Sequence, residues 1–377
     1  MAWMLGILSA LYLALLVKEA RKAKQNRAAL CHVIHVNGTR GKSSVTRLID
    51  SGLRGGGLRC FCKTTGTLPR IIDCSGTERD LPRRGRPNIR EQLKVLEMAA
   101  KDKAQVLVVE CMAVNPQLQW ISQHRILQAD CGVITNVRSD HLDVMGKTLE
   151  EIALSMSSTI PKKGLFFTAD QRFFPFFTRQ CKQLDTVPAL VLPTGQEPEL
   201  DFGENIALAL AVCKSLGVDE SSALAGMRQH YKRDPYALSF YELDSGAVAI
   251  GGFSINDPDS TASVYEKLTK RDEFAGHRLT LLINNRPDRS FRTRQHAQLA
   301  AKLQPDRVWV VGAGRRTMGR RIARALPSAQ IEAFGSARSI PLDRLGKEDC
   351  LYCIGNLARE GLAVMQRLEK EGKRLVL

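Results

Sequence analysis

The amino-acid sequence predicts an α/β fold in which helices cover mostly parallel β-sheets. Short apolar runs rich in β-branched residues alternate with segments of helical periodicity from residue 31 onward. Hydrophobic residues make up 44% and charged residues 25% of the 377 residues, which is the balance of a globular protein. Alternating strands and helices are typical of parallel sheets, because a parallel connection needs a long crossover segment.

The first domain is expected to span residues 30–244. Its predicted strands cover residues 31–36, 58–65, 105–111 and 131–137. Its predicted helices include residues 43–54 and 88–103, and Asn88 is the expected cap of the second. Ligands bind beyond the carboxyl ends of parallel strands, so we expect a site in the loops that follow these strands.

A smaller, Rossmann-like α/β domain is predicted for residues 245–377. Four further strands are expected at residues 246–254, 277–285, 306–314 and 349–356. The third of these ends in Gly312 and Gly314, which match the start of a dinucleotide-binding pattern, but Thr317 occupies the position of its third glycine. We therefore interpret this segment as a tight turn between a strand and a helix.

The N-terminal segment, residues 1–29, has a different composition. Residues 1–17 carry no charge. Five basic residues follow: Lys18, Arg21, Lys22, Lys24 and Arg27. As a helix, the apolar run would be about 25 Å long, at the short end of what crosses a bilayer. We expect a single-pass anchor in a bacterial cell membrane, with the basic flank and the remaining chain in the cytoplasm; a buried or interfacial helix is the alternative.

The chain is strongly basic. It carries 55 Lys and Arg residues against 39 Asp and Glu residues, a net charge of +16. Such an excess indicates a polyanionic partner, such as nucleic acid, anionic lipid, phosphate or an acidic polymer. Solubility and proximity to a membrane would account for it equally well. We see no motif that reads a nucleic-acid groove, so we do not expect nucleic acid as the partner.

The ten cysteines favour a reducing environment. Their spacing matches neither a disulfide framework nor a zinc site. Several, such as Cys111 and Cys131, stand next to apolar runs. This pattern indicates buried, reduced thiols.

The loop after the first strand has a displaced glycine. The usual phosphate-binding loop, G-x-x-x-x-G-K-[ST], would place its first glycine at position 36, but the chain has Val36 there and Gly38 two residues later. The context is that of a phosphate site, because the free N–H groups of a helix that starts near Ser43 would face an anion. Lys42 would then reach the phosphates, and the Ser43 hydroxyl would bind Mg²⁺.

Acidic and polar side chains follow two other predicted strands. Glu110 ends one buried strand, a position from which it can hold Mg²⁺ directly or through water. Asn136, Asp140, His141 and Asp143 follow the next strand. They predict either a second divalent-cation site or a polar turn that caps a helix.

These segments resemble the ATP-binding domain of the Mur ligase superfamily, the ATP-dependent amide ligases that include folylpolyglutamate synthase. Gly38 to Ser43 spells the shortened phosphate loop G-T-x-G-K-[ST] of that superfamily, and "ECMAVNP" and "DHLDVMG" are long matches to its poly-γ-glutamate synthase branch. The resemblance implies a P-loop-type central domain and covers nearly the whole chain, most weakly after about residue 300. Met156 or Ser157 stands where many members carry a carbamylated lysine, an absence that this branch shares.

The resemblance also implies roles for individual residues. The phosphate loop would consist of Gly38, Thr39, Gly41, Lys42, Ser43 and Ser44. The Mg²⁺ ligands would be Ser43, Glu110 and His141. Further nucleotide contacts would come from Asn205, Asn256, Asp257, Ser260 and Asp288. The residues expected to take part in catalysis are Lys42, Glu110, His141, Arg286 and Arg289.

The activity implied by the resemblance is ligation of glutamate through its γ-carboxyl group. ATP and Mg²⁺ would be required, an acyl phosphate would be the intermediate, and ADP and phosphate would be released. Glutamate and poly-γ-glutamate would be substrate and product, and membrane-bound synthase or export subunits would be partners. Two alternatives stay open: a γ-glutamyl ligase for another amino acid, and an ATPase that energises a membrane export complex.

Overall fold

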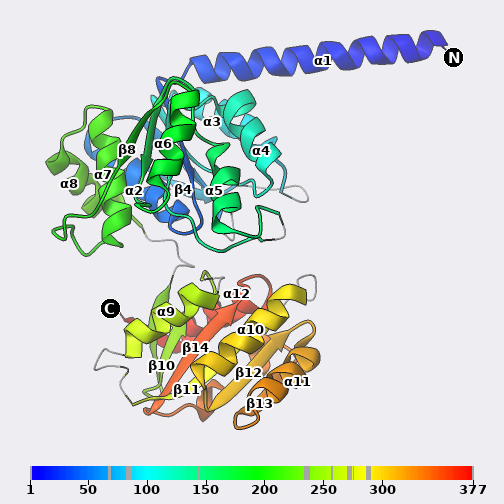
Figure 1. Cartoon of the computed structure of the whole chain (residues 1–377), viewed down its shortest axis with the longest axis vertical. Coiled ribbons are helices and arrows are strands. Elements are labelled where there is room, and N and C mark those ends of the chain that lie inside the picture. Colours follow the sequence, from blue (N-terminus) through cyan, green and yellow to red (C-terminus); the bar gives the residue numbers. More distant parts are fainter. Residues whose placement is uncertain are drawn as a thin grey trace. The chain divides into compact units, whose positions relative to one another are not determined.

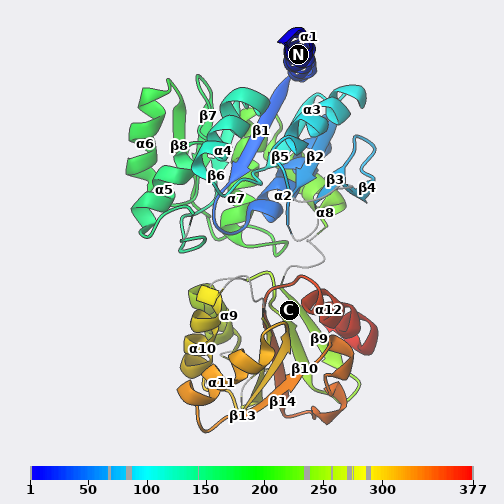
Figure 2. The same cartoon turned by 90° about the vertical axis from the view of Figure 1, so that its right-hand side faces the viewer.

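The computed structural model of the chain describes residues 2–66, 69–81, 87–142, 144–232, 238–255, 258–269, 274, 276–285 and 290–375. The chain divides into two compact units, residues 1–234 and residues 235–377 (Figure 1). Each unit contains one sheet with helices on its two faces (Figure 2). The predicted α/β class with mostly parallel sheets is therefore confirmed.

The first unit contains an 8-stranded sheet in the order β4-β3-β2-β5-β1-β6-β7-β8. Its strands are β1 (His32–Asn37), β2 (Cys60–Thr64), β3 (Arg70–Ile72), β4 (Glu78–Asp80), β5 (Val106–Glu110), β6 (Cys131–Ile134), β7 (Leu165–Thr168) and β8 (Val187–Leu190). The β2–β3 and β3–β4 pairs are antiparallel and the other pairs are parallel. The predicted strands correspond to β1, β2, β5 and β6, whereas the other four strands were not predicted.

The core of this unit lies on both faces of the sheet. Ile34 and Val36 of β1 pack with α2 (Lys42–Gly55), α7 (Gly203–Ser215) and α8 (Glu220–His230). Val33 packs on the other face with α3 (Glu91–Lys101) and the π-helix η1 (Ser122–Leu127), because successive strand residues point to opposite faces. The remaining helices of the unit are α1 (Ala2–Ala28), α4 (Pro116–Ile121), α5 (Leu149–Ser157) and α6 (Phe174–Gln183).

Helix α1 corrects the prediction for the N-terminus. The apolar run is helical as expected (Figure 1). Most of its large apolar side chains are exposed. Across the described ranges, however, no helix has the length and apolar character needed to cross a membrane. The predicted single-pass anchor is therefore not supported. The uncharged run has only 17 residues, and the same helix then continues through charged residues, of which Lys22 pairs with Glu97 of α3 at 2.8 Å.

The second unit contains a 7-stranded sheet in the order β13-β12-β11-β14-β10-β9-β15. Its strands are β9 (Ser239–Leu243), β10 (Val248–Gly251), β11 (Arg278–Asn285), β12 (Arg307–Gly312), β13 (Gln330–Phe334), β14 (Asp349–Gly355) and β15 (Gly372–Leu375). Its helices are α9 (Pro258–Thr269), α10 (Ser290–Leu303), α11 (Arg315–Ala325) and α12 (Glu360–Glu371), with the short 3₁₀ helices η3 (Ala337–Ser339) and η4 (Leu342–Arg344). β9 pairs antiparallel with β10 and β15, and the other pairs are parallel.

This sheet tests two predictions made from the sequence, the positions of four strands and the turn at Gly312 and Gly314. The four predicted strands correspond to β10, β11, β12 and β14, and the proposed domain boundary at residue 245 falls between β9 and β10. The turn at Gly312 and Gly314 is confirmed as a tight strand-to-helix connection. These glycines have φ values of 89° and 75°, and Gly314 is the N-cap of α11.

The ten cysteines are all free thiols. Eight are buried, Cys74 is half-buried and Cys31 is exposed. Burial raises the pKa of Cys181 and of Cys213 to about 12, which makes these thiols unreactive at neutral pH. The predicted burial of the thiols is confirmed except at Cys31 and Cys74.

Candidate functional site

The predicted phosphate loop lies at the centre of the first sheet. β1 pairs in parallel with β5 on one side and with β6 on the other, and the chain passes from the end of β1 at Asn37 into α2 at Lys42. From β1 the chain proceeds to β2 on one side, whereas it later reaches β6 on the other side. The loops at such a switch in strand order diverge and leave a crevice at the carboxyl ends of the strands.

Two glycines allow the loop to bend tightly. Gly38 has a φ of 132° and Gly41 a φ of 81°, conformations that other residues rarely adopt. A Cβ atom at Gly38 would lie 2.0 Å from Oγ1 of Thr135, and one at Gly41 would lie 2.6 Å from Oδ1 of Asn205. Both positions therefore require glycine, and the displaced Gly38 is fixed by its approach to the loop after β6.

Helix α2 begins with open amide groups. Its N-cap, Gly41, has no side chain to accept a hydrogen bond, so the first-turn N–H groups of Lys42, Ser43 and Ser44 have no partner within the helix. The Nζ of Lys42 bends over the loop and donates to the carbonyl oxygens of Gly38 (2.7 Å) and Thr39 (3.2 Å). Amide groups, helix dipole and ammonium group together form the environment that binds phosphate.

Ser43 and Glu110 are in direct contact. The Ser43 hydroxyl donates to Oε2 of Glu110 at 2.8 Å, and the backbone N–H of Thr65 donates to the same oxygen at 2.7 Å. Glu110 ends β5 and is only 2% exposed. A hydroxyl and a carboxylate are ligands that hard divalent cations prefer. The structure thus brings together two of the three residues predicted to bind the metal.

His141, the third predicted ligand, lies against Asp140. Its φ is 49°, its backbone N–H donates to Oδ1 of Asp140 at 2.9 Å, and its Nε2 is 3.8 Å from that oxygen. Among the residues that the structure describes, no group of three or more His, Cys, Asp and Glu side chains could hold a metal ion. Asp143, part of the predicted second cation site, lies outside them. A cation at Ser43 and Glu110 would therefore depend on phosphate and water oxygens, as Mg²⁺ usually does.

The loop after β6 holds the phosphate loop in position. The Oδ1 of Asn136 accepts from the N–H of Arg40 at 3.1 Å, and its Nδ2 donates to the Arg40 carbonyl at 3.1 Å. The Thr39 side chain accepts from the N–H of Arg138 at 2.9 Å. Asn136, which the sequence suggested as part of a cation site or polar turn, acts here as a clamp on Arg40.

Asn205 reaches the loop from the start of α7. It is 7% exposed, and its Nδ2 donates to Oδ1 of Asp201 at 2.7 Å. The hydroxyl of Tyr231 donates to the other carboxylate oxygen of Asp201. Asp201 and Tyr231 therefore fix the orientation of the side chain that faces Gly41. Sequence reasoning missed both, although Asp201 stands four residues before Asn205, a spacing at which side chains around a helix start can meet.

The predicted site residues of the second unit stay predictions. Five of them lie outside the described residues: Asn256, Asp257, Arg286, Asp288 and Arg289. Ser260 belongs to α9, where its backbone alone is described.

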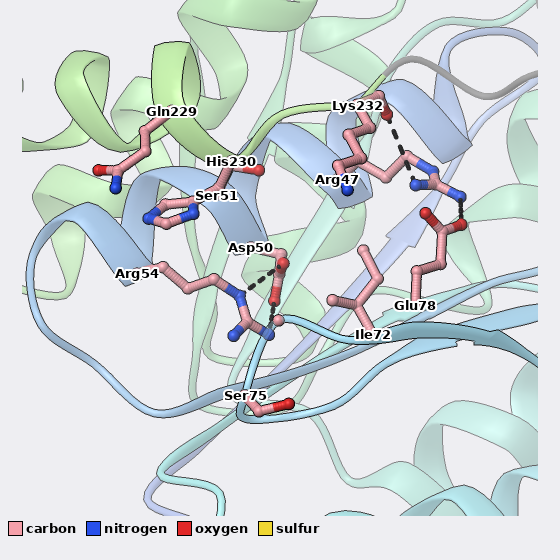
Figure 3. A pocket seen from close by; sticks show the side chains of 11 residues that line it. Arg47, Asp50, Ser51, Arg54, Ile72, Ser75, Glu78, Gln229, His230 and Lys232 are labelled. Carbon is pink, nitrogen blue, oxygen red and sulfur yellow. Dashed lines mark hydrogen bonds and ion pairs between the residues drawn. The ribbon is translucent and has the colours of Figure 1, made fainter.

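A cavity of about 190 Å³ lies along α2 beyond its first turn (Figure 3). Its charged groups pair with one another: Arg47 with Glu78, and Arg54 with Asp50 at 2.9 Å. Burial raises the pKa of Asp50, although the hydrogen bond from Arg54 opposes that shift. The cavity contains no phosphate-loop residue. The Arg47–Glu78 pair joins α2 to β4, whereas the Asp50–Arg54 pair lies within α2. We assign no ligand to the cavity.

Two strands that lead to the site carry buried polar side chains. His35 of β1 is fully buried, its Nδ1 lies 2.9 Å from Oε1 of Gln123, and burial lowers its pKa to about 4. Lys63 of β2 is also fully buried and pairs with Glu91 of α3 at 2.9 Å. Both groups therefore depend on internal partners in place of water.

Two domain families match the chain. Residues 36–183 match the Mur ligase middle domain, and residues 240–371 match the C-terminal domain of the poly-gamma-glutamate synthase CapB. The first match contains the phosphate loop, Glu110 and His141. The second covers most of the second unit.

Two curated relatives are similar over most of this chain. The PGA synthase CapB of Bacillus subtilis is 36% identical over 307 residues, which cover 78% of each chain. The capsule biosynthesis protein CapB of Bacillus anthracis is 35% identical over 313 residues, 79% of this chain. The chain spans 66% of the length of the B. anthracis relative.

Solved structures of folylpolyglutamate synthases share the fold. E. coli FolC in complex with ADP has a TM-score of 0.72 at 13% identity, over 94% of both chains. The bifunctional folylpolyglutamate synthase/dihydrofolate synthase of Yersinia pestis, with AMPPNP and Mn, has a TM-score of 0.69 at 14% identity, over 93% of both chains. This likeness confirms the predicted Mur-ligase-like α/β fold.

Proposed function

Because the chain belongs to the CapB family of poly-γ-glutamate synthases, we propose that it is an ATP-dependent ligase that joins glutamate units through their γ-carboxyl groups. The observation that carries the proposal is the phosphate loop with the adjoining Ser43–Glu110 contact, at the centre of a Mur-ligase-like sheet. The name of the B. anthracis relative further supports a role in capsule synthesis, together with other subunits of such a system.

The residues of the loop fit a nucleotide phosphate and a divalent cation. Gly38 and Gly41 let the loop backbone lie close to Thr135 and Asn205, with which a Cβ atom at either position would collide. The first-turn amides of α2 and the ammonium group of Lys42 would hold the phosphates, and Ser43 and Glu110 would hold the cation. A bound cation would neutralise phosphate charge at this position.

The reaction needs ATP because a carboxylate is a poor acylating group. Transfer of the γ-phosphoryl group to a carboxylate oxygen gives an acyl phosphate and ADP. The amine of a second glutamate unit then attacks the carbonyl carbon and loses a proton, and phosphate leaves as the amide forms. Phosphoryl transfer depends mainly on positioning and charge neutralisation. The amides and Lys42 of this loop would supply both, and Glu110 would act through the cation that it holds.

A lysine substitution tests the phosphate-loop assignment. Lys42→Ala should abolish glutamate-dependent ADP release but leave the chain folded, because its Nζ bonds only to two loop carbonyls among the contacts described. Lys182→Ala, which removes an exposed lysine of α6, is the matched control and should keep the parent rate. Full ADP release by the Lys42 variant would refute the assignment.

Substrate identity is tested with labelled glutamate. Incorporation into a γ-linked polymer, with ADP release that depends on glutamate, supports the proposed reaction. ADP release without amide formation would instead indicate an ATPase of an export complex. Stimulation by another amino acid in place of glutamate would indicate a different γ-glutamyl ligase.

A further inference from the structure

Helix α11 of the second unit is unusually rich in arginine. It has 11 residues and contains no Asp or Glu. Five of its residues are arginines: Arg315, Arg316, Arg320, Arg321 and Arg324. All are exposed except Arg315, which is half-buried. The helix packs beside β12 and the edge strand β13 and also against α10 (Figure 1).

The arginines of α11 are fixed in place by the opposite face of the helix. Met318, Gly319 and Ile322 are buried, and Met318 and Ile322 belong to the core against the sheet. Arg316, Arg320, Arg321 and Arg324 are therefore directed away from the sheet and are exposed, whereas Arg315 lies nearer the packed face. Within the described ranges, none of the five forms an ion pair or a side-chain hydrogen bond. Unneutralised charge of this density on one helix is costly through self-repulsion, and an anionic ligand would relieve that cost.

The segment around this helix is one of the most basic parts of the chain. Residues 290–325 contain nine Lys and Arg residues and a single acid, Asp306, a net charge of +8. The entire chain carries +16, so half of its excess resides in under a tenth of its length. A charge distributed for solubility alone would not gather in this way. The concentration indicates a partner that is itself a dense polyanion.

The spacing of the arginines suits an extended polymer with a repeat of about 6 Å. Arg316, Arg320 and Arg324 are four residues apart and lie along one side of the helix, with successive positions about 6 Å apart along the axis. A γ-linked glutamate unit has five backbone bonds in place of three. Scaled from ~3.6 Å per extended α-linked residue, its repeat is roughly 6 Å, with one free carboxylate per unit. Each guanidinium group could therefore meet a successive carboxylate.

The N-terminal end of α11 would extend this row. An open depression of about 360 Å³ is lined there by Gly314, Arg315, Arg316 and Thr317. Gly314 provides no side-chain cap, so the first-turn amides are also available to an anion. Amide groups and guanidinium groups thus line one continuous basic track from Gly314 to Arg324.

We propose that the arginine row of α11 binds the growing poly-γ-glutamate chain and keeps it on the enzyme between additions. This inference rests on the proposed function, because the polymer is its product. The row is separate in sequence from the phosphate loop and takes no part in the chemistry. Its loss should weaken polymer binding and shorten the product, while the addition of glutamate to a short acceptor continues.

A triple variant tests the proposal in the full-length chain. Arg316→Gln, Arg320→Gln and Arg324→Gln together remove the row but keep good helix formers. The matched control removes three exposed basic residues of the first unit by Arg179→Gln, Lys182→Gln and Arg228→Gln. Affinity for a fluorescently labelled γ-linked glutamate oligomer is measured by anisotropy at low and physiological salt. Circular dichroism checks that both variants are folded.

We expect the triple variant to bind the oligomer at least about tenfold more weakly than the parent, with a shallower salt dependence, and the control to stay within about twofold of it. Both variants should retain glutamate-dependent ADP release with a short γ-glutamyl acceptor. Equal oligomer affinity in the triple variant and the control would overturn the proposal. So would tighter parent binding of single-stranded DNA or phosphatidylglycerol vesicles, lost in the triple variant. A parent enzyme without glutamate-dependent ADP release would instead overturn the proposed function.

Discussion

Mild acid should destabilise the first unit in part by acting on a buried histidine, His35. This residue is fully buried in β1, the strand that carries the phosphate loop, and burial lowers its pKa to about 4 from an ordinary 6.5. The Nδ1–H of the neutral ring donates to Gln123, whose own amide donates to the Ala129 carbonyl at 3.2 Å. Nε2 has no hydrogen-bond partner among the described residues. Protonation would place a charge on that buried nitrogen.

The magnitude follows from the two pKa values. Between pH 6.5 and about 4 the unfolded chain binds the proton and the folded chain does not, so stability falls as the pH falls through this window. The full loss is roughly 3 kcal/mol at ~1.36 kcal/mol per pH unit, and about 2 kcal/mol of it should occur between pH 7 and pH 5. Above pH 7 the contribution is constant, because both states are neutral there.

A substitution isolates this contribution from that of the other titrating groups. His35→Gln keeps an amide donor for Gln123 but cannot be protonated, so its loss of stability from pH 7 to pH 5 should be smaller than the parent's by about 2 kcal/mol. His32→Gln removes an exposed histidine at the start of the same strand and should behave as the parent. Hydrogen exchange of β5 peptides in increasing urea gives the opening free energy of this unit. An equal acid-dependent loss in the parent and in His35→Gln would refute the reasoning.

Three further substitutions test the site and its support. Gly41→Ala should weaken ATP-analogue binding at least about tenfold in calorimetry, because alanine costs ~1–2 kcal/mol at positive φ and its Cβ would collide with Asn205; unchanged affinity would contradict the loop geometry. Glu91→Gln removes the carboxylate paired with buried Lys63 and should lower the unfolding free energy of the first unit by ~3–5 kcal/mol in urea titration. A loss below about 1 kcal/mol would contradict the importance of this ion pair. Glu110→Gln should raise the divalent-cation concentration for half-maximal ADP release about tenfold or more. A cation titration identical to that of the parent would rule out a metal-binding role for Glu110.

The strands that the sequence predicted are those buried on both faces. β5 and β12 read as continuous apolar runs because helices cover both sides of the central sheet positions. β8 and β13 lie at sheet edges, where side chains are partly exposed and polar residues or proline interrupt the run. Their apolar pattern is therefore too weak to distinguish them from loops.

The site was predictable only where its parts are adjacent in sequence or end a strand. Gly38, Lys42 and Ser43 lie within six residues, and Glu110 ends a buried run at the same edge of the sheet. The clamp formed by Asn136 on the phosphate loop depends on which loops meet in three dimensions. Apolar periodicity carries no information about such contacts between distant segments.

The solitary exposed thiol has a practical use. Cys31 stands between the end of α1 and the start of β1, and the other nine cysteines are buried or half-buried. Because alkylation needs an accessible thiolate, a maleimide dye or spin label should attach first at this position. The protein thus offers a natural reporter site at the junction of α1 and the sheet, where spectroscopy can follow the orientation of α1 in solution without an engineered cysteine.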